Sequence, residues 1–127
     1  MSLFQGLIKG IGKAAGKTIH KLNSFEVVKN IAPNKIGVYI MSHHGKVKYV
    51  GRAIEQRPGQ STSGLRKRLQ EHWRGAASAK PELFKYRDEL TVQLRTCETV
   101  EQAKALEAQL IRRYDTVAKG WNLRYED

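Results

Sequence analysis

Two short runs with a period of two residues constrain this chain most, because that period is typical of a β-strand. The first run covers residues 36–41 and the second covers residues 47–51. The connection between them contains Gly45, which can adopt the positive φ that tight hairpin turns require. The two runs therefore predict a β-hairpin. A loop centred on His44 predicts a register with these facing pairs: Met41 with Val47, Tyr39 with Tyr49, and Gly37 with Gly51.

A helical pattern follows the hairpin. Residues 52–63 are polar and rich in turn-forming types, which indicates a loop. Apolar residues at helical spacing then predict a helix over residues 64–75, and Pro81 suits the first turn of a second, short helix.

The rest of the chain predicts one more strand and one more helix. Leucine and valine alternate with polar residues over residues 90–95, a pattern typical of a strand. Thr99 and Gln102 have the spacing of a capping box, which predicts a helix that runs to about residue 114. The predicted order is therefore strand, strand, helix, strand, helix.

The first 25 residues differ in character from the remainder. They contain no acidic residue, and an apolar stripe at helical spacing is accompanied by lysines at intervals of four, namely Lys9, Lys13, Lys17 and Lys21. Several glycines disfavour a helix here without a partner surface. We interpret residues 1–25 as a basic amphipathic arm and residues 26–127 as the folded domain. The alternatives are a helix docked on the domain's own core, a DNA clamp, a dimer contact, a membrane-surface helix and a targeting peptide.

Charge and cysteine content narrow the class of protein. With 23 Lys and Arg against 12 Asp and Glu, the 127-residue chain carries a net charge of +11, which is typical of a protein that binds nucleic acid or an acidic membrane. No apolar run is long enough to span a bilayer. Cys97 is the only cysteine, which excludes an internal disulfide framework and fits a reducing compartment. We expect one soluble, cytoplasmic domain.

Charged side chains fall on the apolar faces of two predicted helices. Glu107 lies within the apolar stripe of the last helix, and a buried carboxylate needs a cation, either a structural arginine or a metal ion. Arg68 and His72 are four residues apart at the edge of the apolar face of the first helix. An ion pair from Arg68 to Glu107 is the structural alternative to a catalytic role.

The two tyrosines of the predicted hairpin have glycines close by. Tyr39 and Tyr49 taken singly would be assigned to packing at the edge of the core. Gly37 and Gly51, however, weaken a strand unless a backbone or a ligand must approach closely. The combination indicates a hairpin that lines a site.

These residues match a known family pattern. Gly37-Val38-Tyr39, followed ten residues later by Tyr49-Val50-Gly51, resembles the paired tripeptides that name the GIY-YIG nucleases. The resemblance spans residues 36–124 and continues in that family's order through Arg68, His72, Glu107 and Asn122. It implies a mixed α/β (α+β) fold, with a small three-stranded antiparallel sheet flanked by helices.

The same resemblance implies an activity, namely the hydrolysis of DNA phosphodiester bonds by an endonuclease with a single divalent metal ion. Glu107 would hold Mg²⁺ or Mn²⁺, because these hard ions accept a sparse set of oxygen ligands. Tyr39 or Tyr49 would be the general base, with its pKa lowered by the charge of Arg68.

Three further roles follow from the resemblance. Arg68 would also bind the scissile phosphate, His72 would orient or relay a proton to one tyrosine, and Asn122 would fix the geometry around the site. A catalytically silent nucleic-acid-binding module on the same scaffold is the rival reading, and a membrane-surface protein ranks last.

Other basic residues are candidates for contact with DNA. Many family members run almost directly from the second tripeptide into the arginine helix, whereas here residues 52–63 intervene. Arg52, Gln56 and Arg57 in this segment could touch phosphate or base edges, and the alternative is a solvated loop. Arg66, Lys67 and Arg74 could contact the phosphate backbone. The expected partner is DNA, with a partner protein or a homodimer for specificity.

Two adjacent histidines lie at the predicted hairpin tip. His43 and His44 have the chemistry of metal ligands. Neighbouring residues at such a tip are expected to point apart, so we interpret them as part of a solvated turn.

Overall fold

The computed structural model describes residues 23–55, 59 and 61–125. Residues 1–22 of the predicted arm, and Arg57 with its neighbour Gln56, lie outside the described residues. The elements in chain order are α3 (Phe25–Ile31), β1 (Gly37–His43), β2 (Lys46–Ala53), α4 (Gly64–Arg74), α5 (Pro81–Lys85), the short 3₁₀ helix η1 (Arg87–Glu89), β3 (Leu90–Thr96) and α6 (Val100–Tyr114).

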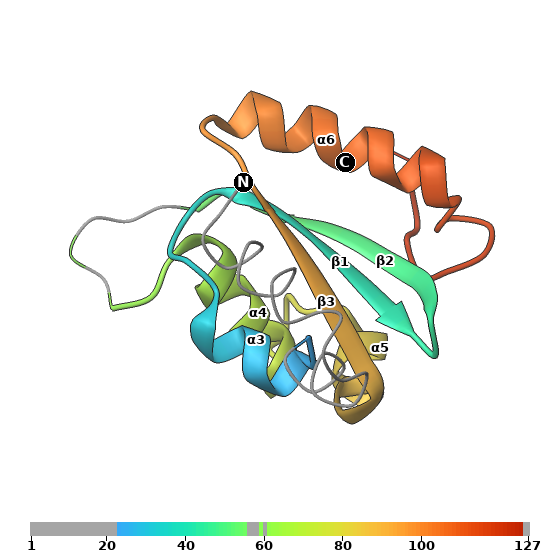
Figure 1. Ribbon diagram of the computed structural model, residues 1–127, viewed down its shortest axis with the longest axis horizontal. Helices are drawn as coiled ribbons and strands as arrows, with labels where there is room; N and C mark the ends of the chain where they lie inside the picture. Colours follow the sequence, from blue (N-terminus) through green and yellow to red (C-terminus); the bar gives the residue numbers. More distant parts are fainter. Residues whose placement is uncertain (1–22, 56–58, 60, 126–127) are drawn as a thin grey trace, which may run out of the picture.

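A three-stranded antiparallel sheet with the order β2-β1-β3 forms the middle layer (Figure 1). Helix α6 covers one face, and α3, α4 and α5 cover the other. Alternate residues of the central strand therefore point into two separate cores, with Tyr39 and Met41 on the α4 side and Val38 and Ile40 on the α6 side. This arrangement confirms the predicted fold class.

Local sequence signals explain where the helices begin and end. The capping box of Thr99 and Gln102 is present at the start of α6, as the sequence predicts. Helix α4 ends at Arg74 and is capped by Gly75, which has a φ of 69°, a left-handed conformation that glycine adopts readily. Helix α3 was not predicted from the sequence. Its side-chain cap is Ser24, and it buries Phe25 and Val28.

The hairpin register differs from the predicted one. Tyr39 pairs with Gly51, Met41 with Tyr49 and Gly37 with Ala53, and an irregularity follows Met41. The predicted pairs are therefore wrong by two residues, because the turn consists of His44 and Gly45, with φ of 51° and 80°, and the bulge adds a residue. The second strand also continues to Ala53, so Arg52 belongs to the strand and not to the loop.

The observed register explains why position 51 is a glycine. Gly51 faces Tyr39 across the two strands, and a Cβ atom there would lie 2.3 Å from the tyrosine oxygen. Any side chain at this position would displace the ring. The glycine of the second tripeptide therefore makes room for the tyrosine of the first.

The two tip histidines do not point apart. The rings of His43 and His44 have centroids 4.0 Å apart, because the left-handed backbone of His44 turns its side chain to the same side as that of His43. The expectation from the sequence is wrong on this point. Among the residues that the structure describes, no helix is long and apolar enough to cross a membrane.

Candidate active site

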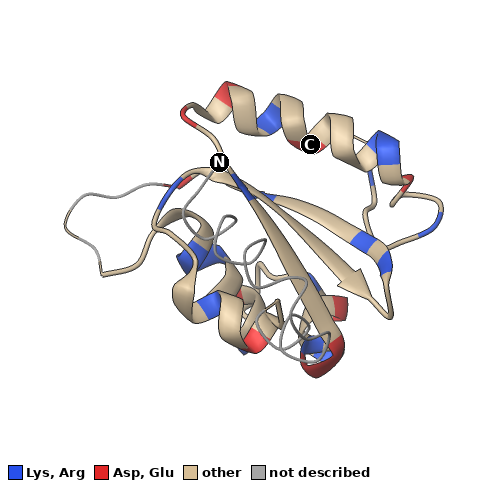
Figure 2. Cartoon of the chain, in the orientation of Figure 1, with Lys and Arg blue, Asp and Glu red and all other residues tan. Residues whose placement is uncertain are grey.

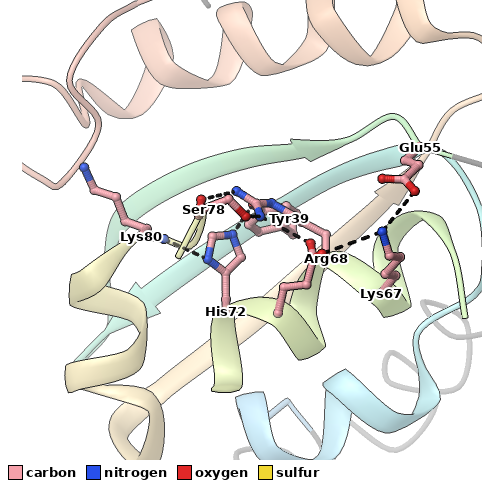
Figure 3. A network of polar contacts seen from close by, with 8 residues as sticks. Tyr39, Glu55, Lys67, Arg68, His72, Ser78 and Lys80 are labelled. Carbon is pink, nitrogen blue, oxygen red and sulfur yellow. Dashed lines mark hydrogen bonds and ion pairs between the residues drawn. The ribbon is translucent and has the colours of Figure 1, made fainter. Parts of the chain in front are cut away.

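Four of the predicted site residues gather on the α4 side of the sheet. Tyr39 and Tyr49 come from the hairpin, and Arg68 and His72 come from successive turns of α4. The Tyr39 oxygen lies 2.6 Å from Nε2 of His72, and both side chains are buried (Figure 3). The Tyr49 ring is 6.2 Å from each of these two rings.

The hydrogen bonds of His72 define where its proton lies. The backbone N–H of Lys80 donates to Nδ1 at 3.1 Å, and a backbone amide can only donate, so Nδ1 carries no proton. Burial, with the nearby charge of Arg68, lowers the pKa of His72 to about 3. The imidazole is therefore neutral, its proton lies on Nε2, and His72 donates to the Tyr39 oxygen.

The environment of Tyr39 acts on its pKa in both directions. Burial is the largest effect and raises the pKa well above its ordinary value, and the negative charge of Glu107 also raises it. The charge of Arg68 and a hydrogen bond from Arg68 lower it. The tyrosine is thus protonated in the free protein, so the expectation from the sequence that Arg68 leaves this pKa lowered is wrong for Tyr39, because burial outweighs the nearby charge. His72 and Arg68 are the two donors at its oxygen.

A short segment between α4 and α5 holds the guanidinium of Arg68. Its Nη1 atom donates to Ser78 Oγ at 3.2 Å and to Glu71 Oε1 at 3.3 Å, and Nη2 donates to the Ser78 carbonyl at 3.0 Å. Figure 3 shows Arg68, Ser78, Tyr39 and His72 converging. Arg68 therefore pairs with Glu71, and the ion pair with Glu107 considered from the sequence is not formed.

Glu107 approaches from the other face of the sheet. It lies on α6 with 3% of its side chain exposed, and Arg52 Nη1 donates to its Oε1 at 2.7 Å. Arg52 is on the same face because it pairs with Val38, whose side chain packs against α6. The cation that a buried Glu107 requires is therefore an arginine of strand β2.

Asn122 clamps the edge strand β2. Its side-chain oxygen accepts from the backbone N–H of Val50, and its side-chain nitrogen donates to the Val50 carbonyl, both at 2.9 Å. The preceding residue, Trp121, donates its backbone N–H to the Lys48 carbonyl at 2.6 Å. These bonds fix the strand on both sides of Tyr49 and satisfy groups that an edge strand otherwise leaves unpaired.

The residues predicted to contact DNA differ in whether their side chains are exposed or bonded to other parts of the protein. Arg74 is exposed, whereas Arg66 donates from Nε to the Ala32 carbonyl at 2.7 Å and so caps the end of α3. Lys67 lies 2.9 Å from Glu55 and 3.6 Å from Glu71. Figure 2 shows Lys and Arg on both helical layers.

Sequence reasoning missed the residues that support the site. Glu71, Ser78 and the Lys80 backbone hold Arg68 and His72 in place. A backbone donor and a serine in a loop leave no pattern in a sequence, although Glu71 lies three residues after Arg68 and an ion pair at that spacing could have been predicted. Ser78 and Glu71, together with Arg52 and Arg68, also line a cavity of about 320 Å³.

The model of the GIY-YIG catalytic domain matches residues 35–122. The chain belongs to the GIY-YIG family. The match covers both tripeptides and includes Arg68, His72, Glu107 and Asn122. None of the curated proteins compared with the chain matches it.

Solved structures with a similar fold include a domain of one bacterial protein. A Tyr-to-Phe mutant of the GIY-YIG N-terminal endonuclease domain of UvrC from Thermotoga maritima, bound to its catalytic divalent cation, is 23% identical, with a TM-score of 0.59, and the match covers 79% of this chain and 96% of that one. The same domain bound to magnesium is 24% identical, with a TM-score of 0.55 over 72% of this chain and 90% of that one. At these identities, the structural likeness supports the fold.

The lowered pKa of His72 predicts that acid destabilises the protein. Unfolded histidine takes up a proton near pH 6.5, whereas folded His72 does so only near 3, so the unfolded state binds more protons between these values. The His72 contribution to the free energy of unfolding should fall by about 2 kcal/mol between about pH 7 and pH 5. Urea unfolding of the wild type and of His72→Gln at each pH measures this difference.

The exposed Gln109 of α6 provides the control for this measurement. Gln109→Ala should leave the pH dependence of unfolding as in the wild type, because the side chain is exposed and has no titratable group. If His72→Gln shows the same pH dependence as the wild type, the interpretation of His72 as a buried, neutral histidine is wrong.

Proposed function

We propose that this protein is a divalent-metal-dependent DNA endonuclease that hydrolyses phosphodiester bonds at the site of Tyr39, Tyr49, Arg68, His72, Glu107 and Asn122. The observation that carries the proposal is the buried contact from His72 to Tyr39 with Arg68 beside it. A phenol in a purely structural core needs only one hydrogen-bond partner. Two donors around one phenol oxygen instead stabilise the phenolate once the proton has left, and a phenolate is a base.

Tyr39 is the general base in this proposal. Its own proton first passes to solvent, and the resulting phenolate accepts hydrogen bonds from Nε2 of His72 and from Arg68. The phenolate then takes a proton from the attacking water. The positive charge of Arg68 stabilises the phenolate and also binds the scissile phosphate. His72 stays neutral because burial and the charge of Arg68 lower its pKa, and the Lys80 backbone N–H keeps Nδ1 as the acceptor, so His72 orients the tyrosine and does not compete for the proton.

Glu107 suits a hard divalent cation by the chemistry of its donors. A carboxylate is the ligand that Mg²⁺ and Mn²⁺ prefer, and such ions complete their shell with water and substrate phosphate, so one protein carboxylate is sufficient. When bound, the ion would stabilise charge on the phosphoryl oxygens. The UvrC domain that resembles this chain binds magnesium, which supports the assignment.

Arg52 makes a second candidate function possible. Its ion pair with Glu107 satisfies the carboxylate without a metal, which is what a catalytically silent DNA-binding module would retain. The net charge of +11 favours DNA as the partner in both cases. The two functions differ in whether metal and Glu107 control cleavage.

Substitution of Glu107 distinguishes the two. The wild type should cleave labelled single-stranded or duplex DNA in Mg²⁺ or Mn²⁺, and EDTA should abolish this cleavage. Glu107→Gln should lower the cleavage rate on the order of 10²-fold or more. Glu101→Gln, on the exposed side of the same helix, should cleave like the wild type. Circular dichroism and DNA-binding anisotropy check that Glu107→Gln is folded and binds.

Two outcomes would contradict parts of the proposed nuclease function. If the wild type binds both DNAs and cuts neither with any of the metals, the binding module is the function. Cleavage at the wild-type rate by Glu107→Gln would show that Glu107 is not part of the catalytic site.

Tyr39→Phe and Tyr49→Phe identify the base. Tyr39→Phe should lower the cleavage rate about 10²- to 10⁴-fold and remove its rise with pH, because the proton acceptor is lost. In the wild type the rate should rise with pH, since burial keeps most of Tyr39 protonated near neutrality. A larger loss in Tyr49→Phe, with the pH dependence abolished there instead, would assign the base to Tyr49.

A further inference from the structure

The hairpin tip brings two imidazoles to one carboxylate. Nε2 of His43 and Nε2 of His44 each lie 3.2 Å from the same oxygen, Oε1 of Glu89. Glu89 is the last residue of η1, which comes much later in the chain than the hairpin. Three side chains from two separate segments therefore present their donor atoms to one point, within 4.8 Å of one another.

The spacing of these donor atoms suits a small metal ion. An ion with bonds of about 2.0–2.1 Å to nitrogen and oxygen in tetrahedral geometry separates its ligand atoms by about 3.3 Å. Both nitrogen-to-oxygen distances of 3.2 Å are close to this value. Two imidazoles and one carboxylate form a ligand set that zinc accepts, with a fourth position left for water.

Packing fixes the orientation of one ligand and leaves the others open to solvent. The His43 ring lies 4.9 Å from the Tyr86 ring and 5.9 Å from the Trp121 ring, and its side chain is only 17% exposed. The side chains of His44 and Glu89 are 71% and 49% exposed, which gives an ion a path from solvent. Such a part-built site limits the entropy that is lost on binding.

We propose that His43, His44 and Glu89 bind one Zn²⁺ ion, or a similar transition-metal ion, at the hairpin tip. Imidazole ligands distinguish this site from the all-oxygen site proposed at Glu107, because hard ions such as Mg²⁺ prefer oxygen. The ion joins the β1–β2 turn to η1 at the start of β3.

The proposed site is connected to the C-terminal segment of the described chain. Trp121 stacks on Tyr86 with ring centroids 5.5 Å apart, and both rings pack against His43. Asn122 follows Trp121 and clamps Val50. An ion that orders His43 and Glu89 therefore stabilises the segment that holds β2 beside the candidate active site.

Zinc titration of the full chain, with a chromophoric indicator as competitor, tests the proposal. The wild type should bind one Zn²⁺ per chain, and His44→Ala and Glu89→Gln should each weaken binding at least about ten-fold. Both substitutions are at exposed positions, so the fold should persist. Zinc should also raise the unfolding temperature of the wild type and not that of a variant that carries both His44→Ala and Glu89→Gln.

Three control variants separate this site from other zinc ligands. His20→Ala and Cys97→Ser should bind zinc as the wild type does. Glu107→Gln should also retain zinc binding, so the proposal and the nuclease function can fail independently. Cobalt in place of zinc should give the strong visible absorption of a tetrahedral site in the wild type and lose it in Glu89→Gln.

Unchanged zinc affinity in His44→Ala and in Glu89→Gln would overturn the proposal. So would several weak ions per chain that bind irrespective of these residues. In either case the three side chains form only a hydrogen-bonded cluster around Glu89.

Discussion

The hydrogen bond from His72 to Tyr39 joins the central strand to helix α4 inside the larger core. Both side chains are buried, so each polar atom requires a partner and the helix is held at one position along the strand. Arg68 lies one turn earlier on α4 and reaches the tyrosine only because this position is fixed. Gly51 lacks a side chain so that the phenol can occupy the space.

The site also depends on the edge of the sheet. Tyr39, Arg68 and His72 lie on one face, and Glu107 comes from the helix on the other, with Arg52 of the edge strand as its partner. Asn122 and Trp121 cover that edge and fix the strand. The small sheet thus combines a base, a phosphate-binding arginine and a carboxylate from three elements. Further strands beyond β2 would separate the residues on the two faces of the sheet, because they would cover this edge.

The sequence predicts the elements better than their pairings. Period-two and helical patterns locate the strands and helices α4 and α6, and the paired tripeptides indicate the family, because these signals are local. The predicted register is wrong because the observed one depends on one bulge and on a two-residue turn with positive φ at His44, a conformation that non-glycine residues rarely adopt. Arg52 as the partner of Glu107, Ser78 beside Arg68, and Glu89 between the tip histidines all follow from long-range packing, which has no periodicity.

The protonation of His72 tests the central claim most directly, namely that a neutral imidazole donates to Tyr39 and prepares it as a base. Nitrogen-15 NMR of the histidine side chains reports which ring nitrogen carries the proton. The structure predicts a proton on Nε2 and none on Nδ1, unchanged between about pH 8 and pH 5. A His72 ring that is protonated on Nδ1, or on both nitrogens within that range, would contradict this account.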